Sequence, residues 1–281
     1  MKSPVIILGA PRSGTTILGD ILALHSKLHF AIEPNPLWKR YVSSECDYFD
    51  LEQERGAVGA TRELFAAQLV DSGKQRLLEK TPQNCLRVPF VHAVFPDAKF
   101  VHIIRDGVES SLSIAKYWET NTKGFRGVRI RQRIQEASFS QLYYYGKQAA
   151  KRILPVGDSP RVFWGPVLPG MGGLVKSHSI LEVAALQWRY CVEQATYYGR
   201  RLPSDQYMEL RLEDFHEATL KRILDFAGLE HEESVLQAAN ELFVAGQTTH
   251  RQRDASESDI ELVRRWIEPT MSWLGQSDSR D

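Results

Sequence analysis

The first residues whose types and spacing suggest chemistry form a loop over 9–16, which reads Gly-Ala-Pro-Arg-Ser-Gly-Thr-Thr. The loop follows the apolar run 5–8 and precedes a helical spacing of apolar residues that starts at Ile17. A strand, a tight loop and a helix N-terminus bind an anion well, because backbone N–H groups and the helix dipole converge at one point. We therefore expect a phosphate to bind at Pro11, Arg12, Ser13, Gly14, Thr15 and Thr16.

The loop departs from the common nucleotide-triphosphate motif at one position. Gly9, Gly14 and Thr16 keep the spacing of G-x-x-x-x-G-K-[ST], but Thr15 stands where that motif has its lysine. Arg12 supplies a positive charge instead, and its planar fork suits an oxyanion held by two hydrogen bonds. The missing lysine argues against a kinase, and the alternative interpretation is a glycine turn with a surface arginine.

A second segment indicates another phosphate site. The apolar run 100–104 leads directly into Arg105, and the helical pattern that follows carries Ser113 eight residues later. An arginine that leaves a strand and a serine two helical turns further on can hold a phosphate between them. Two phosphate sites at two strand ends imply a nucleotide with two separate phosphate positions.

In these segments the chain resembles the sulfotransferases that use 3'-phosphoadenosine 5'-phosphosulfate (PAPS). Residues 10–16 match the family's 5'-phosphosulfate loop, and residues 100–107 with Ser113 match its 3'-phosphate element. Residues 79–82 and 210–215 add weaker matches, so the resemblance covers residues 3–115 well and 178–275 loosely. It implies transfer of a sulfuryl group to a hydroxyl, or less readily an amine, with adenosine 3',5'-bisphosphate as product and no metal.

Three catalytic roles follow from this resemblance, which in motif spacing is nearest to the tyrosylprotein sulfotransferase branch. In that branch a glutamate follows the loop arginine by 21 residues, as Glu33 follows Arg12 here. The resemblance implies that Arg12 neutralises the phosphosulfate, Lys80 stabilises the departing phosphate and Glu33 is the general base. The alternatives are a surface role for Lys80, simple solvent exposure of Glu33, and His29 as the base.

Other candidate residues have structural alternatives. Residues 246–251 stand where family members carry a basic segment over the 3'-phosphate, so Arg251 is either a nucleotide ligand or a solvated arginine. His102 lies inside an apolar run and is expected to be a core histidine. Asp214 is expected to cap the helix that follows it.

Composition is typical of an α/β protein with a full core. The chain has 281 residues, of which 43% are hydrophobic, and the charges cancel as 35 minus 35, so no overall field attracts nucleic acid or an anionic membrane. Cys46, Cys85 and Cys191 have neither a disulfide pattern nor zinc-ligand spacing, and no leader or apolar anchor is visible. These features predict a cytoplasmic protein without a metal site.

The elements expected to position these residues alternate along the chain. Strands over 4–8, 76–79, 99–104 and 206–211 alternate with helical patterns, which predicts a P-loop-like parallel sheet flanked by helices in a single domain over 1–281. The expected helices cover 57–70, 88–95, 180–198, 214–227 and 257–274. Both phosphate loops follow strands, at the edge where such sheets bind ligands.

Residues 119–177 break this alternation. Residues 119–153 look helical and carry a basic stretch over 123–133, whereas 155–173 are rich in proline and glycine and are expected to be a loop. We expect an acceptor-binding insertion and lid here, for a small-molecule, glycan or lipid-precursor acceptor; the alternative is a solvated basic helix with a surface insertion. The remaining functional alternatives are a small-molecule kinase and a non-catalytic nucleotide-binding protein whose basic stretch docks a partner.

Overall fold

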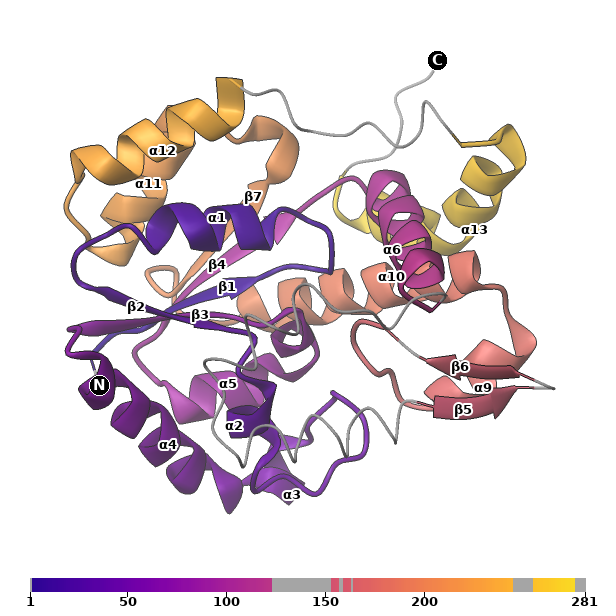
Figure 1. The fold of residues 1–281 in the computed structure, drawn as a ribbon, viewed down its shortest axis with the longest axis horizontal. Helices are drawn as coiled ribbons and strands as arrows, with labels where there is room; N and C mark the ends of the chain where they lie inside the picture. Colours follow the sequence, from indigo (N-terminus) through magenta and orange to yellow (C-terminus); the bar gives the residue numbers. More distant parts are fainter. Residues whose placement is uncertain (1, 123–152, 157–158, 163, 245–254, 276–281) are drawn as a thin grey trace.

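A parallel sheet of five strands forms the centre of the fold, in the order β2-β3-β1-β4-β7 (Figure 1). The structure is a computed structural model that describes residues 2–122, 153–156, 159–162, 164–244 and 255–275. The strands are β1 (Val5–Leu8), β2 (Leu28–Ile32), β3 (Arg76–Lys80), β4 (Lys99–Ile104) and β7 (Tyr207–Arg211). The expected parallel sheet flanked by helices is therefore confirmed.

Helices cover both faces of the sheet, because successive side chains of a strand point to opposite sides. Val5 and Ile7 of β1 belong to one core, and Ile6 and Leu8 belong to the other. The first core is covered by α1 (Thr15–Leu22), α11 (Glu217–Ala227) and α12 (Glu233–Val244). The second is covered by α4 (Ala57–Ser72), α5 (Val88–Val94), α6 (Gly107–Thr122), α10 (Ile180–Gly199) and α13 (Glu257–Trp273).

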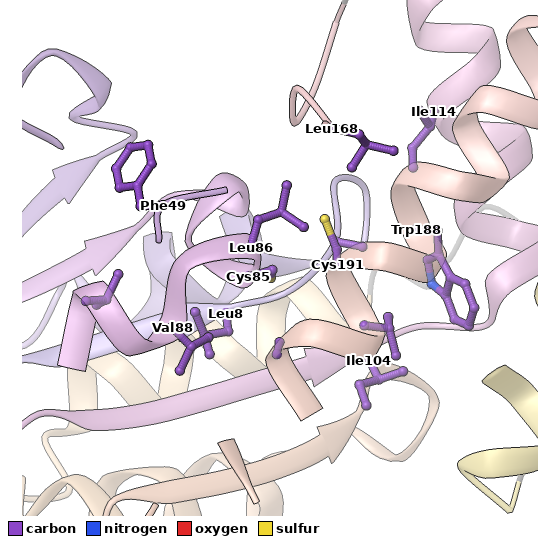
Figure 2. Close-up of a cluster of buried hydrophobic side chains, with 14 of the residues drawn as sticks. Leu8, Phe49, Cys85, Leu86, Val88, Ile104, Ile114, Leu168, Trp188 and Cys191 are labelled. Carbon is purple, nitrogen blue, oxygen red and sulfur yellow. The ribbon is translucent and has the colours of Figure 1, made fainter. Parts of the chain in front are cut away.

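The second core is the larger one and extends beyond the sheet, where α10 packs against α6 and α13 (Figure 1). Figure 2 shows Leu8 and Ile104 from the sheet near Cys85, Trp188 and Cys191 from the elements that cover it. The remaining elements are α2 (Asn35–Lys39), α3 (Leu51–Glu54), the 3-10 turns η1 (Pro82–Arg87) and η2 (Leu212–Asp214), α9 (Met171–Ser177), β5 (Ile153–Val156) and β6 (Ser159–Val162).

Two segments differ from the sequence-based expectation. Strand β2 was not expected; it is an edge strand of five residues, and Phe30 packs closely against Gly19 of α1. The loop expected over 155–173 is wrong in part, because β5 and β6 form an antiparallel ribbon and α9 follows it. Prolines fit an isolated ribbon, since both of its strands are edges. Most of the helix expected over 119–153 lies outside the described residues.

The N-cap residue of α11 also differs from the one expected from the sequence. His216, not Asp214, is the N-cap residue, and its Nδ1 accepts a hydrogen bond from the Thr219 amide at 3.3 Å. Asp214 ends the turn η2, and its backbone carbonyl accepts from the Thr219 hydroxyl. In the part of the chain that the structure describes, no helix is both long and apolar enough to cross a lipid bilayer.

Candidate functional site

Residues 9–16, where we expect a phosphate to bind, connect β1 to α1, as the sequence predicts. We call this segment the phosphate loop. Gly14, at the N-cap of α1, has φ 84°, and Arg12 has φ 67°, so the chain turns sharply twice before the helix begins. Ser13 and Thr15 are buried, and the Ser13 hydroxyl donates to the Ala10 carbonyl at 2.5 Å. These side chains therefore support the loop, whereas those of Arg12 and Thr16 are exposed.

Gly9 lets the loop pass close to the sheet. A Cβ at Gly9 would lie 2.6 Å from Ser13 Oγ and 2.8 Å from the Ile103 carbonyl oxygen, so any larger residue would displace the loop. The Gly9 amide donates to Cys85 Sγ at 3.1 Å. The start of the loop is thus held by the sheet on one side and by η1 on the other.

Lys80 and Glu33 meet at the carboxyl ends of two neighbouring strands. Lys80 ends β3 opposite Ile32 of β2, and Glu33 follows Ile32 directly. Lys80 Nζ donates to Glu33 Oε1 at 2.8 Å and to Thr16 Oγ1 at 3.0 Å. The Lys80 side chain is only 2% exposed, whereas Glu33 is 30% exposed. A buried ammonium, a half-buried carboxylate and the phosphate loop are therefore in direct contact.

The backbone holds Glu33 in an unusual conformation. Its φ of 47° lies in the left-handed region, where a residue other than glycine is strained, and Pro34 follows it. The Glu33 amide donates to the Lys80 carbonyl at 2.8 Å. This bond directs the Glu33 side chain toward the end of β3.

The two proposed phosphate elements also meet. Arg105, after β4, donates from Nη1 to the Arg12 carbonyl at 3.0 Å and from Nη2 to Glu109 Oε2 at 3.2 Å. Arg12 in turn donates from Nε to Ser113 Oγ on α6 at 3.1 Å. The Trp188 indole donates to the Arg105 carbonyl at 3.1 Å, which holds the strand end in place.

Glu79 is a charged residue of the site region to which sequence reasoning assigned no role. It is fully buried in β3 next to Lys80, and it accepts hydrogen bonds from Trp38 Nε1 at 2.9 Å, from Asn84 Nδ2 at 2.7 Å and from the Thr81 hydroxyl. Burial raises the pKa of Glu79 from 4.5 to about 7. The available signal was an acid directly after the apolar pair Leu77 and Leu78 of an expected strand.

His29 does not lie with the other candidate residues. It pairs with Leu77 of β3, whereas Lys80 pairs with Ile32, so His29 lies toward the start of β2, about 10 Å before that strand's end. Burial lowers its pKa, and the nearby charge of Lys74 lowers it further. The structure thus separates His29 from the contact between Glu33 and Lys80.

His102 lies in the core, as expected. It is fully buried in β4, its Nδ1 lies 2.7 Å from the Tyr207 hydroxyl, and burial lowers its pKa to about 4. Arg251, the basic stretch 123–133 and most of the expected insertion lie outside the described residues. Among the residues that are described, no group of three or more His, Cys, Asp or Glu side chains is placed to hold a metal ion.

Comparison with known proteins gives two relatives that match part of the chain. Over 126 residues the chain is 29% identical to an uncharacterized protein of Aquifex aeolicus, which covers 40% of this chain and 17% of that protein. Over 132 residues it is 25% identical to the nodulation protein NoeE of Sinorhizobium fredii, which covers 40% of this chain and 31% of that protein. The chain thus spans less than a third of the length of these curated relatives.

Solved structures share the fold, and a family model matches the sequence. A sulfotransferase domain from the curacin biosynthetic pathway superposes with a TM-score of 0.53 at 16% identity, over 85% of this chain and 78% of that one. A sulfotransferase from Mycobacterium avium superposes with a TM-score of 0.55 at 12% identity, over 97% and 76%. At these identities the superpositions show the fold alone. The model of the sulfotransferase family matches residues 4–159, which is more than half of the sequence, and the chain therefore belongs to the sulfotransferase family.

Proposed function

We propose that the protein transfers a sulfuryl group from PAPS to a hydroxyl group, or less readily an amine, of an acceptor. The contact of Lys80 with both Glu33 and Thr16 is the observation that carries this proposal. It joins a cation for the leaving group and a base for the acceptor to the loop that would hold the phosphosulfate. As the acceptor we propose a small molecule, glycan or lipid precursor.

The residues around the loop fit a nucleotide with two phosphate positions. Backbone amides at the start of α1, together with Arg12, would hold the 5'-phosphosulfate, whereas Arg105 and Ser113 would hold the 3'-phosphate. Arg105 binds the Arg12 carbonyl and Arg12 binds Ser113, which supports the proposal that one ligand reaches both phosphate positions. Arg251 remains a further proposed ligand of the nucleotide.

The reaction proposed for Glu33 and Lys80 is an in-line displacement at sulfur. Glu33 takes the proton of the acceptor hydroxyl while the acceptor oxygen forms its bond to sulfur. The bond between sulfur and the bridging oxygen breaks, and Lys80 stabilises the electron pair left on the 5'-phosphate. Lys80 therefore has to shift from Glu33 toward the bridging oxygen, so their ion pair has to loosen when the donor binds.

Calorimetry with adenosine 3',5'-bisphosphate tests the donor site, and adenosine 5'-monophosphate is the matched control ligand. We expect the bisphosphate to bind at least tenfold more tightly, because a hydrogen bond to a charged group contributes about 1.5–3 kcal/mol. Arg105→Ala should remove most of this difference, because the proposed ligand of the 3'-phosphate is then absent. Equal binding of the two nucleotides by the wild-type protein would contradict the proposed donor.

Transfer itself is tested with sulfate-labelled PAPS and a cell extract, followed by identification of the labelled product. Activity should persist in the presence of a metal chelator, because Arg12 and Lys80 provide the positive charge in this proposal. Loss of activity in chelator that one divalent ion restores would contradict the metal-free mechanism. ATP binding that competes with the bisphosphate, with no labelled product, would favour a kinase.

A further inference from the structure

An aromatic ring lies against the arginine of the phosphate loop. Tyr117 is on α6, one turn beyond Ser113, and Arg12 Cζ lies 5.5 Å from the centre of the Tyr117 ring. The same guanidinium donates from Nε to Ser113 Oγ at 3.1 Å. A guanidinium within about 6 Å of a ring centre is attracted to the face of that ring. Two residues of α6 thus hold Arg12: Ser113 accepts its hydrogen bond, and the Tyr117 ring attracts its guanidinium.

A second ring supports the first. The Trp164 ring lies 4.3 Å from that of Tyr117, centre to centre, with an angle of 45° between the planes. Gln187, buried in α10, donates from Nε2 to the carbonyls of Trp164 and Pro166 at 2.9 and 2.8 Å. Trp164 is therefore anchored to α10 through its backbone while its side chain packs on Tyr117.

This arrangement bears on how tightly Arg12 binds an anion. Its side chain is exposed and long, and it projects from a backbone turn with φ 67°. Ordering such a side chain costs conformational entropy when it binds an anion. A ring that orients the guanidinium beforehand reduces this cost.

We propose that Tyr117 is a positioning residue for Arg12, and that Trp164 holds the Tyr117 ring in place. The inference rests on the proposed function only in taking the nucleotide as the anion that Arg12 binds. It links residues 164–166, within the proposed acceptor insertion over 119–177, to the phosphate loop through two rings in tilted contact. Tyr117 acts on the ligand through Arg12 and needs no contact with it.

A double-mutant cycle tests this role, with two probes, adenosine 3',5'-bisphosphate and the sulfate ion. Tyr117→Leu removes the ring face and should weaken binding of both probes about fivefold. Tyr117→Phe keeps the ring and should restore wild-type affinity. In an Arg12→Ala background, Tyr117→Leu should have no further effect, because the group that the ring positions is absent.

Controls separate this role from folding. Tyr190→Leu, which removes an exposed tyrosine of α10, should leave both affinities unchanged, and thermal unfolding checks that each variant is folded. Trp164→Leu should weaken binding only in proteins that retain both Tyr117 and Arg12. Together these variants test the contact of Trp164 with Tyr117 separately from the contact of Tyr117 with Arg12.

The other possible outcomes either support or overturn the positioning role of Tyr117. An equal effect of Tyr117→Leu in the wild-type and Arg12→Ala backgrounds would overturn it, as would no effect on either probe or no binding of either probe. Sulfate binding that depends on Tyr117, without any binding of the bisphosphate, would support the positioning role and contradict the proposed donor. Failure of the proposed function is thereby distinguishable from failure of this inference.

Discussion

Glu33 and Lys80 face each other across the ends of two neighbouring strands, and their contact orders the central part of the candidate site. Lys80 is buried, so its charge is compensated by Glu33 and by the hydroxyl of Thr16. A buried ammonium that lost this carboxylate would be destabilising. Glu33 thus has both a structural and a proposed chemical role, and an experiment has to separate the two.

Glu33→Gln makes that separation, because the amide keeps an oxygen for Lys80 but is not a base. We expect the transfer rate to fall about 10²- to 10⁴-fold, the usual contribution of general base catalysis. The dissociation constant for adenosine 3',5'-bisphosphate should not rise, since the neutral amide competes less than the carboxylate does for Lys80. Rates with labelled PAPS and calorimetry measure the two quantities.

The matched control is Glu63→Gln, which neutralises an exposed glutamate of α4. It should change neither the rate nor the nucleotide affinity. A full transfer rate for Glu33→Gln would show that another group is the base. In that case His29 is the alternative that the sequence offers, although the register of β2 separates it from Lys80.

Glu79 makes stability depend on pH in a defined direction. Burial raises its pKa from 4.5 to about 7, so the folded protein binds this proton more tightly than the unfolded chain does. The free energy of unfolding should therefore fall as the pH rises from about 4.5 to 7, by about 3 kcal/mol at most. Urea unfolding of wild type and Glu79→Gln at pH 5 and pH 8 measures this difference.

In Glu79→Gln that part of the pH dependence should disappear, because no group titrates at this position. Glu63→Gln should keep the wild-type slope, since its carboxylate is exposed. The same slope in Glu79→Gln as in the wild type would show that Glu79 does not titrate differently in the folded and unfolded states.

At the scale of elements, the phosphate loop depends on the backbone of Gly14 at the start of α1. Gly14→Ala would require φ 84° of a residue that disfavours it and would place a Cβ 2.7 Å from Leu212 Cδ1. We expect a loss of about 1 kcal/mol in unfolding free energy. We also expect about tenfold weaker binding of adenosine 3',5'-bisphosphate, because the amides at the helix start would move.

Gly73→Ala provides the matched control for backbone strain. Gly73 ends α4 with φ 67°, and an added Cβ would meet nothing within 4 Å. It should lose a similar amount of stability, measured by urea unfolding, and keep its nucleotide affinity. Equal nucleotide binding by both variants would contradict the role of Gly14 in the loop.

Four of the five strands were predictable from the sequence. Strands β1 and β4 lie in apolar runs, and β3 and β7 were also expected although charged residues interrupt them. The carboxyl ends of β1, β3 and β4 carry the phosphate loops and Lys80. Strand β2 was missed although four of its five residues are apolar, because it is short and its place at the sheet edge is set by pairing with β3. The hairpin of β5 and β6 was missed because its prolines indicate a loop when the partner strand is unknown.

At the scale of the whole molecule, the parallel order of the sheet decides where the candidate residues meet. Residues from the ends of β1, β2, β3 and β4 are far apart in the sequence, yet parallel strands bring these ends to one edge. Cores on both faces keep the strands in register, with α1 and α11 on one side and α5 and α10 on the other. The fold therefore brings together the residues at the carboxyl ends of its strands.

The sequence by itself determined the loop from Gly9 to Thr16, the arginine after β4 and the family to which they belong, because these signals are local. Only the tertiary structure decided that Lys80 contacts both Glu33 and Thr16, that His29 lies apart, and that Arg12 rests on Tyr117. The physical reason is that strand register and helix packing set distances between segments up to about a hundred residues apart, and no local pattern encodes those distances.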